Sequence, residues 1–367
     1  MEHGFPRGFG RGAAHADAVL VLRCLLGITP RELFALIWRV GTAAGALAAI
    51  ERGEAGSDND RAFLAGADPA RIRADLASAG ARFAAPGDAE YPPAFLRLAD
   101  PPVGIFLRGR PLDPGDDRVA LVGSRRPTPT GREVAIDLAR GLVAAGLVVV
   151  SGGAVGIDAA AHRGALDGGG RTVAVLGSGI DVSYPPSNGA LLRAIEATGT
   201  VLGEYPPGVP AEPFRFPARN RLIAGLSRAV VVIEGAAKSG TRITAEHALE
   251  LGLEVFAVPG SVTSPLAQTP LEMIREGATM VRGADDLLAD LGIAGTLRVP
   301  GSSPRLPPPQ RRILETLAAP MLPDAVARAA GLTVPDAISA LIELELRGLV
   351  RGVGGRFERT FSAALQG

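Results

Sequence analysis

Short apolar runs alternate with amphipathic segments of helical period through the middle of the chain. Continuous runs of Val, Leu, Ile and Ala are typical of strands that are buried on both faces of a parallel sheet. Helical segments between such runs predict a doubly wound, mostly parallel α/β domain whose ligand site lies at the carboxyl ends of the strands. The predicted strands are residues 119–122, 147–150, 172–176, 200–202, 229–233 and 255–258, and the predicted helices are residues 131–145, 157–166, 187–198, 217–226 and 241–251.

A different pattern precedes this α/β region, which we place at residues 86–292. Residues 13–85 have apolar positions at helical spacing between Gly and Thr-Pro breaks, and they predict a small helical domain. Its turn Gly41-Thr-Ala-Ala-Gly45 is similar to turns of helix-hairpin-helix and sterile-alpha-motif-like modules, some of which contact DNA, but a packing or partner-contact role is favoured. Residues 1–12 are rich in Gly, Arg and Phe without periodicity, and we expect them to be disordered.

The C-terminal region has the pattern of a separate domain. Residues 293–309 are rich in Gly, Ser and Pro and indicate a linker. Residues 310–367 contain helical patterns and a hairpin with Gly at its tip, which together predict a winged-helix-like domain. Its expected recognition helix, 333–347, displays one cation, Arg347, so DNA reading and protein contact both stay open. The helical patterns cover residues 309–318, 323–330 and 335–347, and the hairpin covers residues 349–359.

Composition argues against several kinds of site. A single cysteine, Cys24, excludes an internal disulfide, and with only four histidines it argues against a Cys/His zinc site, so we predict no metal. Cys24 lies in an apolar helical pattern and is expected to be a buried thiol. No run approaches the roughly 18 apolar residues of a membrane span, and the N-terminus lacks a signal-peptide pattern, so we expect a cytoplasmic protein.

The net charge of zero at first argues against a nucleic-acid partner, because binding phosphates requires cations. Counted by segment, residues 298–359 are the net positive part, with nine arginines against six acidic residues. All basic residues except Lys238 are arginines, so arginine content alone does not indicate phosphate binding. Whether these arginines bind phosphate therefore depends on their positions relative to the strand ends.

Small and polar residues follow the first, second and fifth predicted strands. Gly123-Ser-Arg-Arg126 places backbone N–H groups beside a cation, as in an anion site, although alone a tight turn with surface arginines is the simpler interpretation. Ser151-Gly-Gly-Ala-Val-Gly-Ile-Asp158 is neither a Walker A loop nor a convincing dinucleotide fingerprint, so we expect no cofactor. Ser239-Gly-Thr-Arg-Ile-Thr244 offers hydroxyls and free N–H groups at another helix start, with Lys238 just outside.

Asp158 and His162 stand four residues apart on one face of a predicted helix. As catalysts they would form an acid/base pair, and as structural residues they would be a helix-start carboxylate and its polar neighbour. The structural role is favoured, because no nucleophile or metal cluster accompanies them.

Two arginines at the start of the predicted helix 217–226 require a negative partner. Arg219 and Arg221 fall in its expected first turn, where the helix dipole repels cations. A protein carboxylate such as Glu204 or Glu234 could compensate their charge, and so could an anionic ligand.

The motifs at these strand ends match a known pattern. They are Gly123-Ser-Arg125, Ser151-Gly152, Gly156-Ile-Asp158, Ala161-His162, Val175-Leu-Gly177, Gly179-Ile-Asp181, Tyr184-Pro185, Glu204-Tyr-Pro206, Phe216-Pro217, Arg219-Asn-Arg221, Ile223-Ala-Gly-Leu-Ser227, Ser239-Gly240, Thr244-Ala245 and Val258-Pro-Gly260. With these motifs the chain resembles the DNA-processing protein A family, called DprA or Smf, strongly over residues 91–285 and more loosely at both ends.

This resemblance implies a Rossmann-like fold and a non-enzymatic protein that binds single-stranded DNA. Such proteins receive incoming DNA in natural transformation, protect it from nucleases and single-strand-binding protein, and load the RecA recombinase onto it. The resemblance also implies a homodimer paired through the Rossmann-like domain. The implied partners are single-stranded DNA and RecA, with single-strand-binding protein as a further candidate and no membrane.

The resemblance also implies a positively charged pocket. Arg125, Arg219 and Arg221 are expected to neutralise phosphates, and small or polar residues line the pocket around them. The nearby Phe214 and Phe216 are as readily core residues as stacking surfaces for bases. The predicted DNA-binding residues are Ser124, Arg125, Gly152, Gly153, Arg219, Asn220, Arg221, Lys238, Ser239, Gly240 and Thr241.

The sequence departs from the family pattern in two places. Ser151-Gly-Gly-Ala replaces the more usual Ser-Gly-Leu-Ala, which is a small change. After Pro259-Gly260 the usual Gly-x-Asn is absent and Gln268-Thr-Pro-Leu stands instead, so contacts from that loop are not carried over.

The main alternative is an enzyme similar to the lysine-decarboxylase-like (LOG-like) nucleoside-monophosphate phosphoribohydrolases. Their glycine-rich turn would correspond to residues 235–241 with Glu246, but the Pro and the double Gly of that turn are missing. We therefore predict no hydrolysis and no catalytic residue. A third alternative is a scaffold that uses only its terminal domains.

Overall fold

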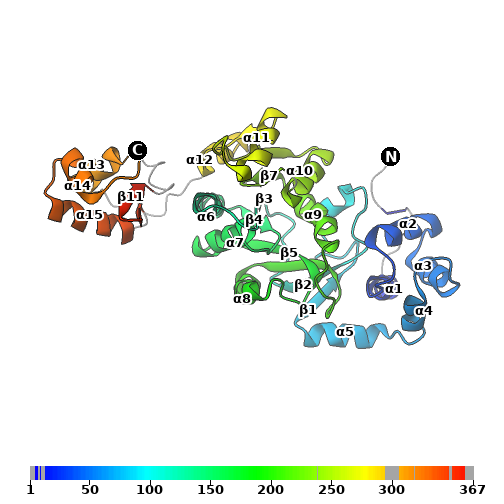
Figure 1. Ribbon diagram of the computed structural model, residues 1–367. Coiled ribbons are helices and arrows are strands. Elements are labelled where there is room, and N and C mark those ends of the chain that lie inside the picture. Colours follow the sequence, from blue (N-terminus) through cyan, green and yellow to red (C-terminus); the bar gives the residue numbers. More distant parts are fainter. Residues whose placement is uncertain are drawn as a thin grey trace.

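A computed structural model of the protein describes residues 5–6, 9, 13–237, 239–293, 306–317, 319–346 and 349–359 (Figure 1). Among these residues, no single helix has both the length and the apolar composition of a membrane span. The bent pairs Pro30–Val40 with Ala43–Glu51 and Pro323–Ala330 with Val334–Leu346 meet that test only when each pair is counted as one segment.

A nine-stranded sheet, counted over the described residues, forms the centre of the molecule. Its order is β1-β2-β6-β5-β4-β3-β7-β8-β9; the strands from β3 onward are parallel, and β1 and β2 add an antiparallel edge. The predicted doubly wound, mostly parallel α/β fold is therefore confirmed. The strands are β1 (Ala81–Ala84), β2 (Ile105–Gly109), β3 (Arg118–Val122), β4 (Val148–Ser151), β5 (Thr172–Gly179), β6 (Thr200–Tyr205), β7 (Ala229–Val232), β8 (Glu254–Ala257) and β9 (Thr279–Met280).

The winding direction reverses beside β3. From β3 the chain moves outward through β4 and β5 to β6, and α9 then returns it to β7 on the other side of β3. A crevice at such a switch point is where open α/β sheets bind ligands. The helices are α6 (Pro129–Ala144), α7 (Ile157–Asp167), α8 (Gly189–Thr198), α9 (Arg215–Leu226), α10 (Gly240–Glu250), α11 (Gln268–Arg275) and α12 (Ala284–Asp290), with 3-10 turns at Pro93–Arg97, Pro186–Asn188 and Pro265–Ala267.

Helices cover both faces of the sheet, as Figure 1 shows for α6 and α7 on one side and α9 and α10 on the other. Val119 and Leu121 of β3 belong to the core that α6, α7 and α12 complete. Ala120 and Val122, which point the opposite way, belong to the core that α9 and α10 complete. Alternate residues of a strand face opposite sides, so a strand that is apolar throughout has to be covered twice.

Helices α1 to α5 form the N-terminal domain. The ends of α2 follow directly from the sequence, because Thr29 and Glu32 form a capping box around Pro30 at the first turn. Gly41 ends the helix with φ 86°, a left-handed conformation that glycine adopts without steric cost. The bounds are α1 (Ala13–Arg23), α2 (Pro30–Val40), α3 (Ala43–Glu51), α4 (Asp58–Leu64) and α5 (Pro69–Ser78).

One expectation for the N-terminal region needs correction. The predicted helical domain extended to residue 85, but residues 81–84 form β1, which pairs with β2 at the edge of the sheet. Residues 1–12 are expected to be disordered; of the residues described there, Phe5 and Phe9 stack with ring centroids 4.4 Å apart and pack against the core of the helical domain. Apart from Pro6, the rest of that stretch lies outside the described residues.

The C-terminal domain is a winged helix, as the sequence predicts. Gly354 and Gly355 form the tip of its hairpin with φ of 57° and 76°, where glycine is favoured. Arg351 of the hairpin donates a hydrogen bond to Glu133 of α6 at 2.6 Å. Residues 294–305 of the predicted linker lie outside the described residues. The elements are α13 (Pro308–Thr316), α14 (Pro323–Ala330), α15 (Val334–Leu346), β10 (Val350–Val353) and β11 (Arg356–Arg359).

Candidate functional site

A cavity of about 410 Å³ opens at the carboxyl ends of β3 and β7, beside the switch point of the sheet. The starts of α7, α9 and α10 and the loop after β3 form its wall. The structure thus brings together segments that lie more than a hundred residues apart in sequence. Of the predicted site residues, those lining this cavity are Ser124, Arg125, Arg219, Asn220, Ser239, Gly240 and Thr241.

Glu234, just after β7, fixes the loop that carries Ser124 and Arg125. Its carboxylate accepts hydrogen bonds from the backbone N–H of Thr128 at 2.9 Å and from the Thr128 hydroxyl at 2.5 Å. Thr128 in turn caps α6 by accepting from Gly131 N–H at 2.9 Å. The carboxylate of Glu234 therefore lies at the start of α6, where the helix dipole favours negative charge.

Arg125 is the exposed cation of the cavity wall. Its guanidinium lies over the ring of Phe216, 4.9 Å from the centroid, and the rings of Phe216 and Tyr184 are 5.4 Å apart. The Arg125 side chain makes no hydrogen bond or ion pair with any residue that the structure describes. A cation that is held by an aromatic face and lacks a carboxylate partner remains available to an anionic ligand.

Arg219 is a second cation of the wall, but it is buried. It donates to the carbonyl oxygens of Gly152, at 2.6 Å, and Val175, and its Nε donates to Asn220 Oδ1 at 3.2 Å. These contacts satisfy most of its donors within the protein, so its main effect on a ligand is electrostatic.

Burial lowers the pKa of Arg219 to about 10, with Asp158 opposing that shift and Arg125 adding to it. Arg219 therefore stays charged at neutral pH. Burial raises the pKa of Asp158, and Arg219 is the main influence that lowers it again. The wall of the cavity thus carries two arginines and one buried carboxyl group.

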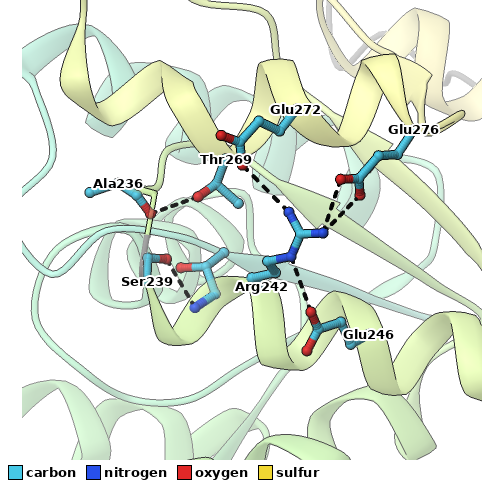
Figure 2. Close-up of polar contacts among 8 residues, drawn as sticks. Ala236, Ser239, Arg242, Glu246, Thr269, Glu272 and Glu276 are labelled. Carbon is cyan, nitrogen blue, oxygen red and sulfur yellow. Dashed lines mark hydrogen bonds and ion pairs between the residues drawn. The ribbon is translucent and has the colours of Figure 1, made fainter.

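The start of α10 supplies polar groups to the opposite wall. Ser239 is the N-cap residue and accepts a hydrogen bond from Thr241 N–H at 3.1 Å. The preceding loop is tied down by Thr269, whose hydroxyl donates to the carbonyl oxygen of Ala236 at 2.7 Å (Figure 2). The end of a helix that presents N–H groups and hydroxyls is suited to phosphate.

Arg242, on the same helix, does not contribute to the cavity. Figure 2 shows its guanidinium directed to Glu246 of α10, to Glu272 of α11 and to Glu276 just after α11, at 3.1, 3.4 and 2.9 Å. Glu246, the carboxylate that the sequence comparison with the phosphoribohydrolases singled out, is exposed and paired with Arg242 outside the cavity. The geometry therefore gives the hydrolase alternative no support.

The position predicted for Arg221 needs correction. Because α9 begins at Arg215, Arg219 and Arg221 lie in its second turn, and successive residues rotate by about 100°, which places them about 200° apart around the helix. Arg221 is buried away from the cavity and pairs with Glu204 at 2.7 Å and with Asp100 at 3.1 Å. Its negative partners come from the protein, so we no longer assign it to the ligand.

Of the remaining predicted DNA-binding residues, those that the structure describes do not line the cavity of about 410 Å³. Gly152 borders a smaller adjoining cavity of about 90 Å³, together with Arg125 and Phe216. Gly153 is buried, and its carbonyl oxygen accepts from Asn188 at 3.0 Å. Lys238 lies outside the described residues.

His162 has a structural environment rather than a catalytic one. It is fully buried, and its Nδ1 lies 2.7 Å from the hydroxyl of Thr172, which itself donates to the carbonyl oxygen of Val149. Because the hydroxyl hydrogen of Thr172 goes to Val149, Thr172 accepts from Nδ1–H of His162. Burial, with a smaller effect of Arg219, lowers the pKa of His162 from its ordinary value of 6.5 to about 3. Within the described part of the chain, no three His, Cys, Asp or Glu side chains gather as metal ligands.

This environment predicts acid sensitivity that the variant His162→Asn would lack. The unfolded chain binds a proton near pH 6.5 and the folded chain only near pH 3, so the stability that the neutral imidazole contributes is present above 6.5 and is lost as the pH falls toward 3. The urea midpoint of the wild type should therefore fall more steeply between pH 6.5 and 4 than that of the variant. Parallel curves for the two proteins would contradict a buried, neutral His162.

Some cavity residues were not predicted as site residues. Tyr184, Asp158 and Thr244 line the cavity, and Phe216 is half-buried in its wall rather than in the core. Phe214 is 62% exposed at the start of α9 and does not line the cavity. The motif Tyr184-Pro185 was visible in the sequence, but its contact with Phe216 depends on how two loops meet in space.

Two family models match the chain, one over the sheet domain and one over the C-terminal domain. Residues 82–292 match the family model described as DNA recombination-mediator protein A, and residues 299–356 match the one described as the DprA winged helix domain. The chain is 38% identical over 357 residues to a putative DNA processing protein DprA of Mycobacterium tuberculosis, covering 89% of this chain and 90% of that protein. It is 36% identical over 319 residues to protein Smf of Synechocystis, covering 76% of this chain and 80% of that protein.

Two solved structures of DNA processing protein A match the fold of this chain. The X-ray structure of DNA processing protein A from Streptococcus pneumoniae matches with a TM-score of 0.60 and 34% identity, covering 77% of this chain and 99% of that chain. The structure that describes the single-stranded DNA binding mode of DNA processing protein A from Helicobacter pylori matches with a TM-score of 0.51 and 30% identity, covering 57% of this chain and 95% of that chain.

Proposed function

The chain belongs to the DNA processing protein A (DprA) family, and we propose that it binds single-stranded DNA in the cavity at the carboxyl ends of β3 and β7. The Helicobacter pylori relative, for which a single-stranded DNA binding mode is described, supports this choice of ligand. The observation that carries the proposal is Arg125, an exposed cation with no ion-pair partner among the described residues, held over Phe216 at the cavity wall.

The side chains of the cavity wall are suited to binding single-stranded DNA of any sequence. Phosphates need cations and N–H donors, which Arg125 and the start of α10 supply. Bases need flat apolar surfaces, which Tyr184 and Phe216 supply. Because every base has a π-face, stacking of this kind tolerates any sequence.

The proposed role extends to the partners that such a DNA complex would meet. In this role the protein protects incoming single-stranded DNA from nucleases and single-strand-binding protein, and it loads RecA onto the DNA during transformation and recombination. It acts as a homodimer through the sheet domain. The description of the matching family as a recombination mediator supports this assignment.

We also infer that the protein is not an enzyme. Glu246, the carboxylate considered for the hydrolase alternative, pairs with Arg242 and does not line the cavity. The buried Asp158 has no activated nucleophile beside it among the residues that line the cavity.

Replacing Arg125 with alanine is expected to weaken the binding of labelled oligo-dT by about 1 kcal/mol, or roughly fivefold, because one charge-assisted phosphate contact is lost. Fluorescence anisotropy at fixed salt measures this change. Since Arg125 has no ion-pair partner in the described structure, the variant should keep the unfolding midpoint of the wild type.

A matched control for this variant is Arg140→Ala. Arg140 lies toward the far end of α6, is half exposed, and pairs with Asp167 at 3.3 Å on the surface. The Arg140→Ala substitution removes the same charge from the same domain as Arg125→Ala, but at a residue that does not line the cavity. Equal losses of affinity in the two variants would mean that only net charge matters, which would contradict the proposed site.

A further inference from the structure

Helix α15 of the winged helix exposes a row of aliphatic side chains. Val334, Ile338, Ile342 and Leu346 are 43%, 40%, 49% and 84% exposed. They repeat every four residues, which places them along one side of the helix. A continuous row of large aliphatic side chains on a single exposed helix is unusual for a surface that faces only water.

This row is distinct from the core of the domain. The opposite side of α15 is buried through Ala337, Ala340, Leu341 and Leu344, which meet α13 and α14. The helix therefore has two apolar sides, and the winged-helix fold itself needs only one of them.

The charges on α15 determine what kind of partner fits. The helix exposes Asp336, Glu343 and Glu345, and no Lys or Arg lies within its described span Val334–Leu346. The next residue, Arg347, lies outside the described residues. Carboxylates beside the row repel phosphates, so this helix is poorly suited to the DNA contact that recognition helices often make.

We propose that this face of α15 binds an amphipathic helix of a partner protein, with aliphatic residues toward the row and Lys or Arg at its border. Aliphatic side chains of the partner would cover Ile338 and Ile342, and its cations would face Glu343 and Glu345, which flank the row. A second copy of α15 fits less well, because a symmetric contact would place these carboxylates near one another.

A synthetic peptide can test this proposal with the full-length protein. The probe is a fluorescent peptide of about 18 residues with Leu at i, i+4, i+7 and i+11 and Lys on the flanking positions. The wild type should bind it more weakly as salt rises, and should bind a scrambled peptide of the same composition at least about tenfold less tightly. The double variant Ile338→Asp with Ile342→Asp should weaken binding of the patterned peptide by roughly tenfold or more.

A matched control places the same change on another exposed aliphatic residue. Leu249 of α10 is 59% exposed, so Leu249→Asp adds a carboxylate to a surface aliphatic position elsewhere and should leave peptide binding unchanged. Equal binding of the patterned peptide by the wild type and the double variant would overturn the proposal. So would a double variant that loses oligo-dT or changes oligomeric state while peptide binding stays the same, since these results would assign the face to DNA or to a second copy.

Discussion

Replacing Glu204 with glutamine is expected to lower the free energy of unfolding by about 3 kcal/mol. Glu204 is buried and receives two hydrogen bonds from Arg221, at 2.7 and 3.0 Å. Burial disfavours the charged form of Arg221, yet Glu204 and Asp100 outweigh this effect and raise its pKa above the ordinary value. Without the Glu204 carboxylate, the partly exposed Asp100 is the one counter-charge that the described residues leave to the buried guanidinium.

The effect should extend beyond one helix. The backbone carbonyl of Glu204 also accepts a hydrogen bond from Arg23, the last residue of α1, which is almost fully buried. Glu204 of β6 therefore links α1, through Arg23, to α9, through Arg221. Urea unfolding followed by far-UV circular dichroism measures the loss.

An exposed ion pair on the same domain provides the control. Arg242 pairs with Glu276 at 2.9 Å, but both side chains are partly in water, so Glu276→Gln should cost no more than about 1 kcal/mol. If Glu204→Gln cost as little as Glu276→Gln, the buried pair would not be the support of α9 described above.

The variant Gly156→Ala is expected to disrupt DNA binding from outside the contact surface. Gly156 precedes α7 with φ 87° and ψ −127°, a backbone conformation that only glycine adopts readily. A Cβ there would collide with the carbonyl oxygen of Ser124 and lie 2.8 Å from Cα of Arg125. The loop that carries Arg125 would have to shift, so we expect at least about a tenfold loss of oligo-dT affinity, because a displaced phosphate contact is lost together with its neighbours.

The control variant Gly146→Ala separates the backbone strain of a positive φ from the displacement of the Arg125 loop. It also has a positive φ, 86°, but a Cβ at this position meets no atom within 4 Å. Gly146→Ala should therefore cost about 1 to 2 kcal/mol of stability and leave DNA affinity unchanged. A Gly156→Ala protein that binds oligo-dT like Gly146→Ala would show that the position of the Ser124–Arg125 loop is unimportant.

Much of the fold follows from local sequence. The six predicted strands and five predicted helices of the sheet domain all occur, because long apolar runs and capped amphipathic segments specify their own structure. The remaining three strands, β1, β2 and β9, lie outside the six predicted ones; β1 and β9 are short edge strands that gain stability by pairing with β2 and β8.

The site was predictable in part for the same reason. Ser124 and Arg125 follow β3, and Ser239 ends the loop after β7, the parallel neighbour of β3, so the topology brings these loops to the same edge of the sheet. Arg221 was misplaced because its direction depends on where α9 begins and on Glu204, a partner 17 residues away. The stacking of Arg125 on Phe216 depends on tertiary packing, which no local pattern reports.

The most direct test of the proposed function is the salt dependence of oligo-dT binding by the wild type, Arg125→Ala and Arg140→Ala. A phosphate site must weaken linearly on a plot of log affinity against log salt, and loss of one contact should reduce the slope by about 0.7. We predict a steep slope for the wild type and for Arg140→Ala, and a slope shallower by about that amount for Arg125→Ala. A flat response of the wild type, or identical slopes for all three proteins, would contradict single-stranded DNA binding through Arg125.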